Sequence, residues 1–105
     1  MSHDSLRHKI EGLAHVSARQ MFGYECYSAK GKFFVGFNRK NKFEVIIRLP
    51  EDEQQKAVKN KGIKPFSHGA KVGWIEIDIK HVSDVDSLKW IRKGYDYALH
   101  LAKRK

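Results

Sequence analysis

The sequence predicts an α+β domain in which an antiparallel sheet packs against helices, with elements in the order α-β-β-β-α-β-α. Three observations predict it. Apolar residues recur at helical spacing near both ends of the chain, short alternating apolar segments lie between, and tight-turn signals join the first segments into a meander. With 105 residues, 41% of them hydrophobic, the chain suits a single domain, residues 1–105, with one core.

The first predicted helix covers residues 5–16, where Leu6, Ile10 and Leu13 recur at helical spacing. Gly12 weakens it, because glycine costs about 1 kcal/mol relative to alanine inside a helix. We therefore expect one amphipathic helix ahead of the sheet.

A three-stranded meander is expected next, beginning with the aromatic-rich strand 21–27. Gly31 supplies a permissive backbone at the first turn, and Asn38 and Asn41 tolerate left-handed conformations at the second.

The second and third strands should alternate between the two faces of the sheet. In the second strand, residues 33–38, one face is expected to carry Phe33, Val35 and Phe37. In the third strand, residues 43–49, one face is expected to carry Phe43, Val45, Ile47 and Leu49, and the other Glu44, Ile46 and Arg48.

A second helix is predicted over residues 50–60, because Pro50 suits a first turn and the acids at 51–53 complement the positive end of the helix dipole. Gly62 is the expected C-cap. Residues 63–73 are predicted to form a loop. The fourth strand, residues 74–79, alternates cleanly, so at least one strand is added to the meander.

The final helix, residues 83–105, is expected to be capped by Ser83 or Asp84 and has a wide apolar face. One stripe contains Leu88, Ile91, Tyr95, Leu99 and Ala102, and the adjoining stripe contains Trp90, Gly94, Tyr97 and Leu101. Two explanations stay open for the second stripe. Either the first helix covers it, or Trp90 and Tyr97 form an interface for self-association or a protein partner.

Five segments carry a family resemblance: ARQMFG from Ala18, the KGKFF turn, GIKPF at 62–66, the Trp74 strand and DSLKWIRKGYDYA at 86–98. Together they resemble the N-terminal domain of the TfoX (Sxy) competence regulators, from about Ala18 to Ala102. The resemblance implies a stand-alone regulatory domain of the YjbR-like and secretion-chaperone-like kind. It implies no known enzymatic activity and no cofactor.

The chemistry-bearing residues favour no enzyme. Six histidines are scattered without a metal-binding motif, and the single cysteine, Cys26, excludes an intramolecular disulfide and a cysteine-rich zinc site. We expect no catalytic residue, metal or cofactor. A closed cleft joining Cys26, Glu76 and a histidine would revive an enzyme hypothesis.

The formal charge of +9 favours anionic partners and makes a sequence-independent nucleic-acid binder, including a DNA binder, the alternative function. If the turns and the loop lie on one side, a basic rim would be formed by Lys30, Lys32, Arg39, Lys40, Lys42, Lys59, Lys61, Lys64 and Lys71. Tyr27, Phe34 or Phe66 would then stack on unpaired bases.

The leading expectation is a non-enzymatic, basic binding or regulatory domain of the TfoX N-terminal type. No apolar run approaches the roughly 20 residues that span a bilayer, and no apolar signal segment stands at the N-terminus. We therefore expect a cytoplasmic protein without membrane contact.

Overall fold

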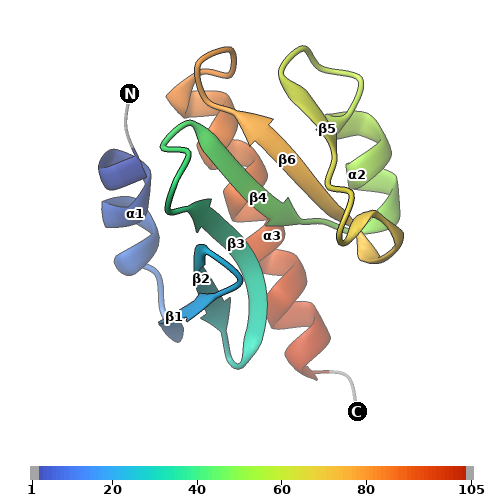
Figure 1. The fold of residues 1–105 in the computed structure, drawn as a ribbon. Coiled ribbons are helices and arrows are strands. Elements are labelled where there is room, and N and C mark those ends of the chain that lie inside the picture. Colours follow the sequence, from blue (N-terminus) through green and yellow to red (C-terminus); the bar gives the residue numbers. More distant parts are fainter. Residues whose placement is uncertain (1–2, 104–105) are drawn as a thin grey trace.

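The computed structural model describes residues 3–103 and arranges them as helices on a sheet (Figure 1). The elements, in chain order, are α1 His3–Glu11, β1 Val16–Met21, β2 Tyr24–Ala29, β3 Lys32–Asn38, β4 Glu44–Arg48, α2 Glu51–Ala57, β5 Ile63–Pro65, the 3-10 helix η1 Ala70–Val72, β6 Trp74–Asp78 and α3 Asp84–Lys103.

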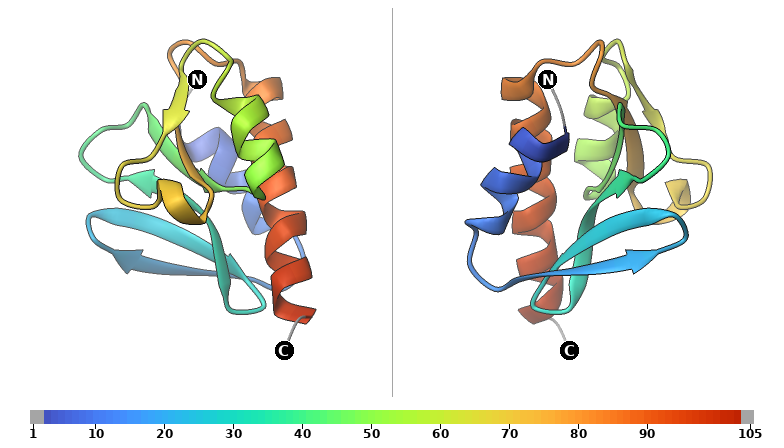
Figure 2. Two further views of the ribbon diagram at one scale, coloured as in Figure 1. Left: turned by 90° about the vertical axis from the view of Figure 1, so that its right-hand side faces the viewer. Right: turned by 60° about the vertical axis from the view of Figure 1, so that its left-hand side comes forward.

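Six strands form one sheet in the order β1-β2-β3-β4-β6-β5, and every neighbouring pair is antiparallel. The three α-helices all lie on one side of this sheet, so its other side is left open (Figure 2). The predicted α+β class, with an antiparallel sheet packed against helices, is confirmed.

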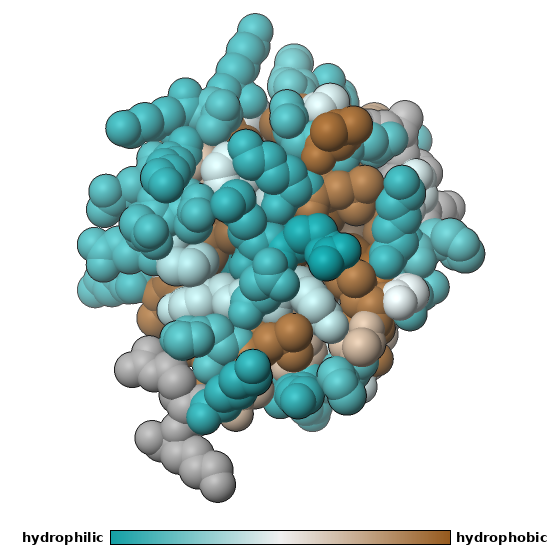
Figure 3. Space-filling view, turned by 180° about the vertical axis from the view of Figure 1, so that it is seen from behind, coloured by the Kyte–Doolittle hydropathy of each residue, from teal (hydrophilic) through white to brown (hydrophobic). Residues whose placement is uncertain are grey.

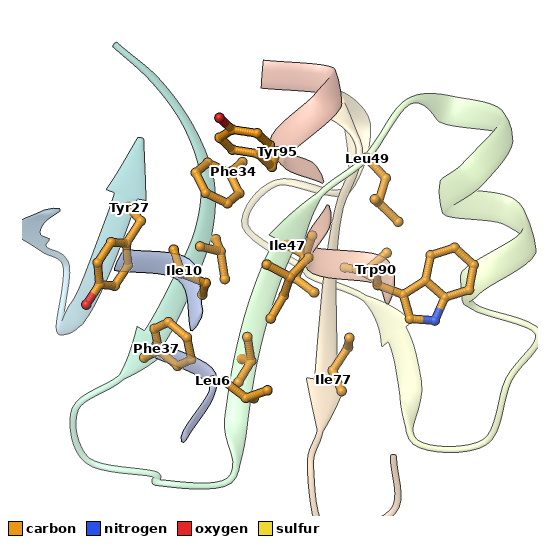
Figure 4. Close-up of a cluster of buried hydrophobic side chains, with 14 of the residues drawn as sticks. Leu6, Ile10, Tyr27, Phe34, Phe37, Ile47, Leu49, Ile77, Trp90 and Tyr95 are labelled. Carbon is orange, nitrogen blue, oxygen red and sulfur yellow. The ribbon is translucent and has the colours of Figure 1, made fainter. Parts of the chain in front are cut away.

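The core lies between the sheet and the helices, where side chains from α1, the central strands and α3 meet (Figure 4). Alternation directs Val45 and Ile47 of β4 and Ile75 and Ile77 of β6 into it, and all four are almost completely buried. Trp90 of α3 belongs to the same core, with 5% of its surface exposed.

The helix α3 approaches the sheet very closely at Gly94. A Cβ atom there would lie 2.9 Å from Cγ2 of Ile47 and 3.0 Å from the carbonyl oxygen of Arg48. At its start, the Ser83 hydroxyl accepts a hydrogen bond from the Asp86 backbone N–H at 3.1 Å, so Ser83 is the N-cap.

The first predicted strand is wrong, because residues 21–27 contain a turn. The chain reverses at Phe22 and Gly23, which join β1 to β2, and both residues have positive φ, 52° and 81°. This is the backbone of a two-residue type I′ hairpin, which asparagine followed by glycine usually forms. Phenylalanine at the first position hides that signal in the sequence.

The expected alternation of the second strand is also wrong. The register of β2 against β3 shifts, since Tyr27 pairs with Val35 and Ser28 pairs with Phe33. The bulge leaves Phe34 as the extra residue and buries it beside Val35. Phe33 is left on the opposite, open face.

Other boundaries differ from the predicted ones. The first helix ends at Glu11, and α2 ends at Ala57 with Val58 as its C-cap, so Gly62 does not cap it. The expected loop at 63–73 contains β5 and η1. A three-residue strand that ends in proline gives almost no sequence signal.

The asparagines of the β3–β4 turn act through their side chains, and neither has positive φ. The Asn38 Oδ1 atom accepts hydrogen bonds from the backbone N–H groups of Lys40 and Asn41, at 2.8 and 3.0 Å. The Asn41 Oδ1 atom accepts another from Phe43 at 3.0 Å. These side-chain acceptors replace the expected left-handed backbone.

Candidate binding surface on the open face of the sheet

The side of the sheet opposite the helices is the candidate functional site. The alternation that buries Ile75 and Ile77 turns Trp74 and Glu76 to this open face. The β1–β2 hairpin extends away from the helices on the same side (Figure 2).

An apolar trough of about 600 Å³ occupies this face. Its residues come from the hairpin, the central strands and the segment before β6: Met21, Phe22, Tyr24, Cys26, Phe33, Ile46, Phe66, His68 and Trp74. The volume lies within the range of about 300–1,000 Å³ typical of ligand pockets, and the mainly apolar lining is also typical of them.

Glycines shape the trough at two positions. A Cβ atom on Gly36 would lie 2.9 Å from Cγ1 of Ile46 and 3.2 Å from Sγ of Cys26, so the bare backbone lets these floor side chains pack together. A Cβ atom on Gly69 would lie 2.6 Å from the Trp74 ring. Because Gly36 and Gly69 have no side chain, the residues of the floor and the Trp74 ring at one wall can pack closely against the backbone.

Phe22 stands at the rim of the trough with 95% of its surface exposed. Its φ of 52° lies in the left-handed region, which costs a residue other than glycine roughly 1–2 kcal/mol. Neither the backbone conformation nor the exposure of this ring is favourable for folding. An aromatic ring at such a position is therefore a candidate contact residue.

Tyr24 and Phe66 close one end of the trough, with ring centroids 5.9 Å apart in an edge-to-face arrangement. The Tyr24 hydroxyl donates a hydrogen bond to Oε2 of Glu44 at 2.5 Å, and the Asn38 amide donates to Oε1 at 3.0 Å. Burial, reinforced by the hydrogen bond and charge of Glu44, raises the pKa of Tyr24 well above its usual value.

Beyond Tyr24 lies a second depression, of about 420 Å³. Its ionisable side chains are Glu44, Lys64, Glu76, Asp78 and Lys80. Burial raises the pKa of the Glu76 carboxyl; the nearby positive charge of Lys64 opposes this rise and the negative charge of Glu44 adds to it.

Cys26 and His68 line the same trough, but the described residues do not form a closed catalytic cleft. Burial raises the pKa of the Cys26 thiol, which disfavours the reactive thiolate. His68 is exposed and makes its ring contact with Phe66, at 5.5 Å. Within residues 3–103 no group of three His, Cys, Asp or Glu side chains is placed to hold a metal ion.

The structure separates the predicted basic rim into two groups at opposite ends of the sheet, because successive turns of a meander lie at opposite ends of its strands. One end carries Arg39, Lys40, Lys42, Lys59 and Lys61, and the other carries Lys30, Lys32 and Lys71. Lys64 lies between them on β5, paired with Glu76.

The aromatic residues expected to stack on bases are divided as well. Tyr27 and Phe34 are buried under the helices, with 1% and 0% of their surfaces exposed. Only Phe66 lies on the open face. The Tyr27 hydroxyl instead accepts a hydrogen bond from Arg7 and donates one to Glu11. These two hydrogen bonds connect α1 to the sheet.

The second stripe of α3 is mostly covered. Trp90 and Gly94 are buried, and Trp90 packs toward the segment between α2 and β5, so α1 is not its cover. Tyr97 is half-buried, with the Arg48 guanidinium 5.8 Å from its ring centroid. On the helix side, apolar side chains surface in separate groups among polar ones (Figure 3).

Sequence reasoning missed Phe22 and Glu44 as parts of one surface. The available signal is the phenylalanine–glycine pair of the ARQMFG segment, which the aromatic-rich pattern of residues 21–27 assigns to a strand. The long-range pairing of β4 with β6, and the loop that brings Phe66 to Tyr24, have no local signal.

Comparison with known proteins identifies the fold and no family. No family model and no curated protein matches the chain. The crystal structure of a protein from Pseudomonas syringae matches it with a TM-score of 0.73, over 93% of this chain and 99% of that chain, at 10% sequence identity. At this identity the likeness shows a shared fold alone. In the described part of the chain, no helix has the length and apolarity to cross a membrane.

Proposed function

We propose that this chain is a non-enzymatic binding domain of the TfoX N-terminal type, with a regulatory role exerted by holding a protein partner in the trough. The observation that carries the proposal is Phe22, an aromatic ring 95% exposed on a left-handed backbone at the rim of an apolar trough. Aromatic side chains are enriched among the residues that contribute most of the binding energy at protein interfaces.

A binding role accounts for the trough better than catalysis does. The thiol of Cys26 has a raised pKa, and the phenol of Tyr24 is engaged by Glu44, so neither group is prepared for proton transfer or attack near neutral pH. A reduced Cys26 also suits the cytoplasmic location that we propose.

The test is a selection of displayed random ten-residue peptides on the whole chain. Affinities of the enriched peptides are then measured for the wild type and for Phe22→Asn. We expect Phe22→Asn to weaken binding at least about tenfold, as loss of an aromatic hot spot does.

The matched control is Val85→Asn, which removes another exposed apolar side chain, 76% exposed, from the start of α3. It should leave the affinities unchanged. Failure to enrich any peptide, or equal binding by Phe22→Asn, would overturn the proposal.

A second candidate function is sequence-independent nucleic-acid binding. The observation that favours it is the group of exposed cations at one end of the sheet: Arg39, Lys40, Lys42, Lys59 and Lys61. Such a group attracts a phosphate backbone, and the affinity would fall steeply with salt concentration.

A further inference from the structure

The open face carries two carboxylates, Glu44 and Glu76, that form no salt bridge within residues 3–103, although the chain as a whole has a formal charge of +9. Within residues 3–103, Glu44 accepts hydrogen bonds from two uncharged donors, Tyr24 and Asn38. Among residues 3–103, neither Glu44 nor Glu76 has a basic nitrogen within 4.0 Å. On the helix side, by contrast, Glu53 is paired with Lys93 at 3.1 Å.

These carboxylates border the apolar trough. Glu76 pairs across the sheet with Ile46, whose side chain forms part of the floor, and such partners have Cβ atoms roughly 4.5–5.5 Å apart. Glu44 is bonded to the hydroxyl of Tyr24, whose ring lines the trough. An occupant of the trough that extends past Tyr24 therefore meets both carboxylates.

The chemistry of this boundary favours a cation. Burial raises the pKa of Glu76, the charge of Lys64 opposes this rise only in part, and the like charge of Glu44 adds to it, so a further positive group between the two carboxylates would be stabilised. A nucleic acid is disfavoured on this face, because its phosphates would meet the same carboxylates.

We infer that the occupant of the open face is a peptide segment of a partner protein that carries a bulky apolar side chain close to a lysine or arginine. The apolar side chain fills the trough beside Phe22 and Trp74, and the cation reaches Glu44 and Glu76 beyond Tyr24. This inference rests on the proposed function and adds the chemical class of the partner.

The experiment repeats the peptide selection on three forms of the whole chain: the wild type, the double variant Glu44→Gln/Glu76→Gln, and the double variant Glu51→Gln/Asp52→Asn. The last pair removes two exposed acids from α2 and changes the net charge equally. On the wild type we expect enriched peptides to combine a large apolar residue with Lys or Arg within a few positions.

On Glu44→Gln/Glu76→Gln the apolar preference should persist and the basic preference should disappear, with roughly tenfold weaker binding of the basic peptides. The α2 variant should select like the wild type. Apolar peptides that need Phe22 but show no basic preference would overturn this inference and leave the proposed function standing. A basic preference that survives in Glu44→Gln/Glu76→Gln would also overturn it. No enrichment on any form would overturn both.

Discussion

Phe22 occupies a position that folding alone would give to another residue. A two-residue type I′ turn requires positive φ at both central positions, and asparagine followed by glycine meets this requirement best. In this chain Gly23 fits, with φ of 81°, whereas Phe22 has an unfavourable backbone and a side chain in water. Folding stability therefore favours another residue at this position, whereas binding of a partner favours the aromatic ring.

The first prediction follows from that conflict. Phe22→Asn should raise the free energy of unfolding by about 1 kcal/mol, since asparagine tolerates the left-handed conformation and no buried contact is lost. Urea unfolding of both proteins measures the change. A destabilised variant would mean that the Phe22 ring packs on the folded chain, and its role as a contact residue would lose its support.

Glu76 gives a prediction about pH. Its pKa is raised in the folded chain, so the folded state holds its proton more tightly than the unfolded state, and stability falls as pH rises from the usual glutamate value through the folded pKa. Glu76→Gln removes this loss. The variant should be more stable than the wild type at pH 7, by less than about 1 kcal/mol because solvent screens the group.

The stability advantage of Glu76→Gln should shrink as pH falls below about 4.5, where the glutamate is protonated in both states. Urea midpoints at pH 7 and pH 4 give the comparison. A variant that is less stable than the wild type at pH 7 would show that the ionised carboxylate is stabilised by its surroundings, contrary to the inferred need for an external cation.

At the scale of elements, periodicity decided what the sequence predicted. β6 and α3 were found because Ile75 and Ile77 alternate and because Leu88, Ile91 and Tyr95 recur at helical spacing. The division of 21–27 into two strands was missed, since phenylalanine conceals the turn. The bulge at Phe34 was missed because both arrangements of that strand are equally apolar.

The candidate site was predicted far less well than the fold. The trough joins Tyr24 to Phe66, forty-two positions along the chain, through contacts that arise only when β6 lies between β4 and β5. Sequence periodicity places residues on faces of single elements and carries no information on strand order. The basic residues were identified correctly as exposed, but their two groups lie at opposite ends of the sheet.

The packing of α3 on the sheet gives the third prediction. Gly94→Ala should lower the free energy of unfolding by roughly 1–3 kcal/mol, because the added methyl group overlaps Ile47 and the backbone of Arg48. We expect this loss of stability even though alanine is favoured over glycine in a helix by about 1 kcal/mol.

Gly12→Ala is the matched control. The new Cβ atom there meets only the Lys9 carbonyl oxygen, at 3.6 Å, so the variant should be as stable as the wild type or slightly more stable. Equal effects of the two substitutions would mean that α3 has room to shift away from the sheet.

At the scale of the whole molecule, charge is distributed by topology. Most of the basic residues gather at the two ends of the sheet, while carboxylates, apolar side chains and Lys64 occupy its open face. A phosphate backbone would have to follow one end of the sheet, where Lys42 and Lys80 lie over the Phe43 ring, at 5.5 and 4.8 Å. Basic composition therefore produces a long-range field without a continuous basic groove.

The last prediction distinguishes long-range electrostatic attraction by the whole chain from a local nucleic-acid site. The triple variant Lys40→Gln/Lys42→Gln/Lys61→Gln alters one end of the sheet, and Lys30→Gln/Lys32→Gln/Lys71→Gln alters the other; each lowers the formal charge from +9 to +6. We expect both to weaken binding of a labelled single-stranded oligonucleotide equally, in salt titrations by fluorescence anisotropy, because only the field attracts it. The contrary outcome is that only the first triple variant reduces the slope of log affinity against log salt, by about 2 for three lost phosphate contacts. In that case a nucleic-acid site exists at that end of the sheet, and the second candidate function replaces the first.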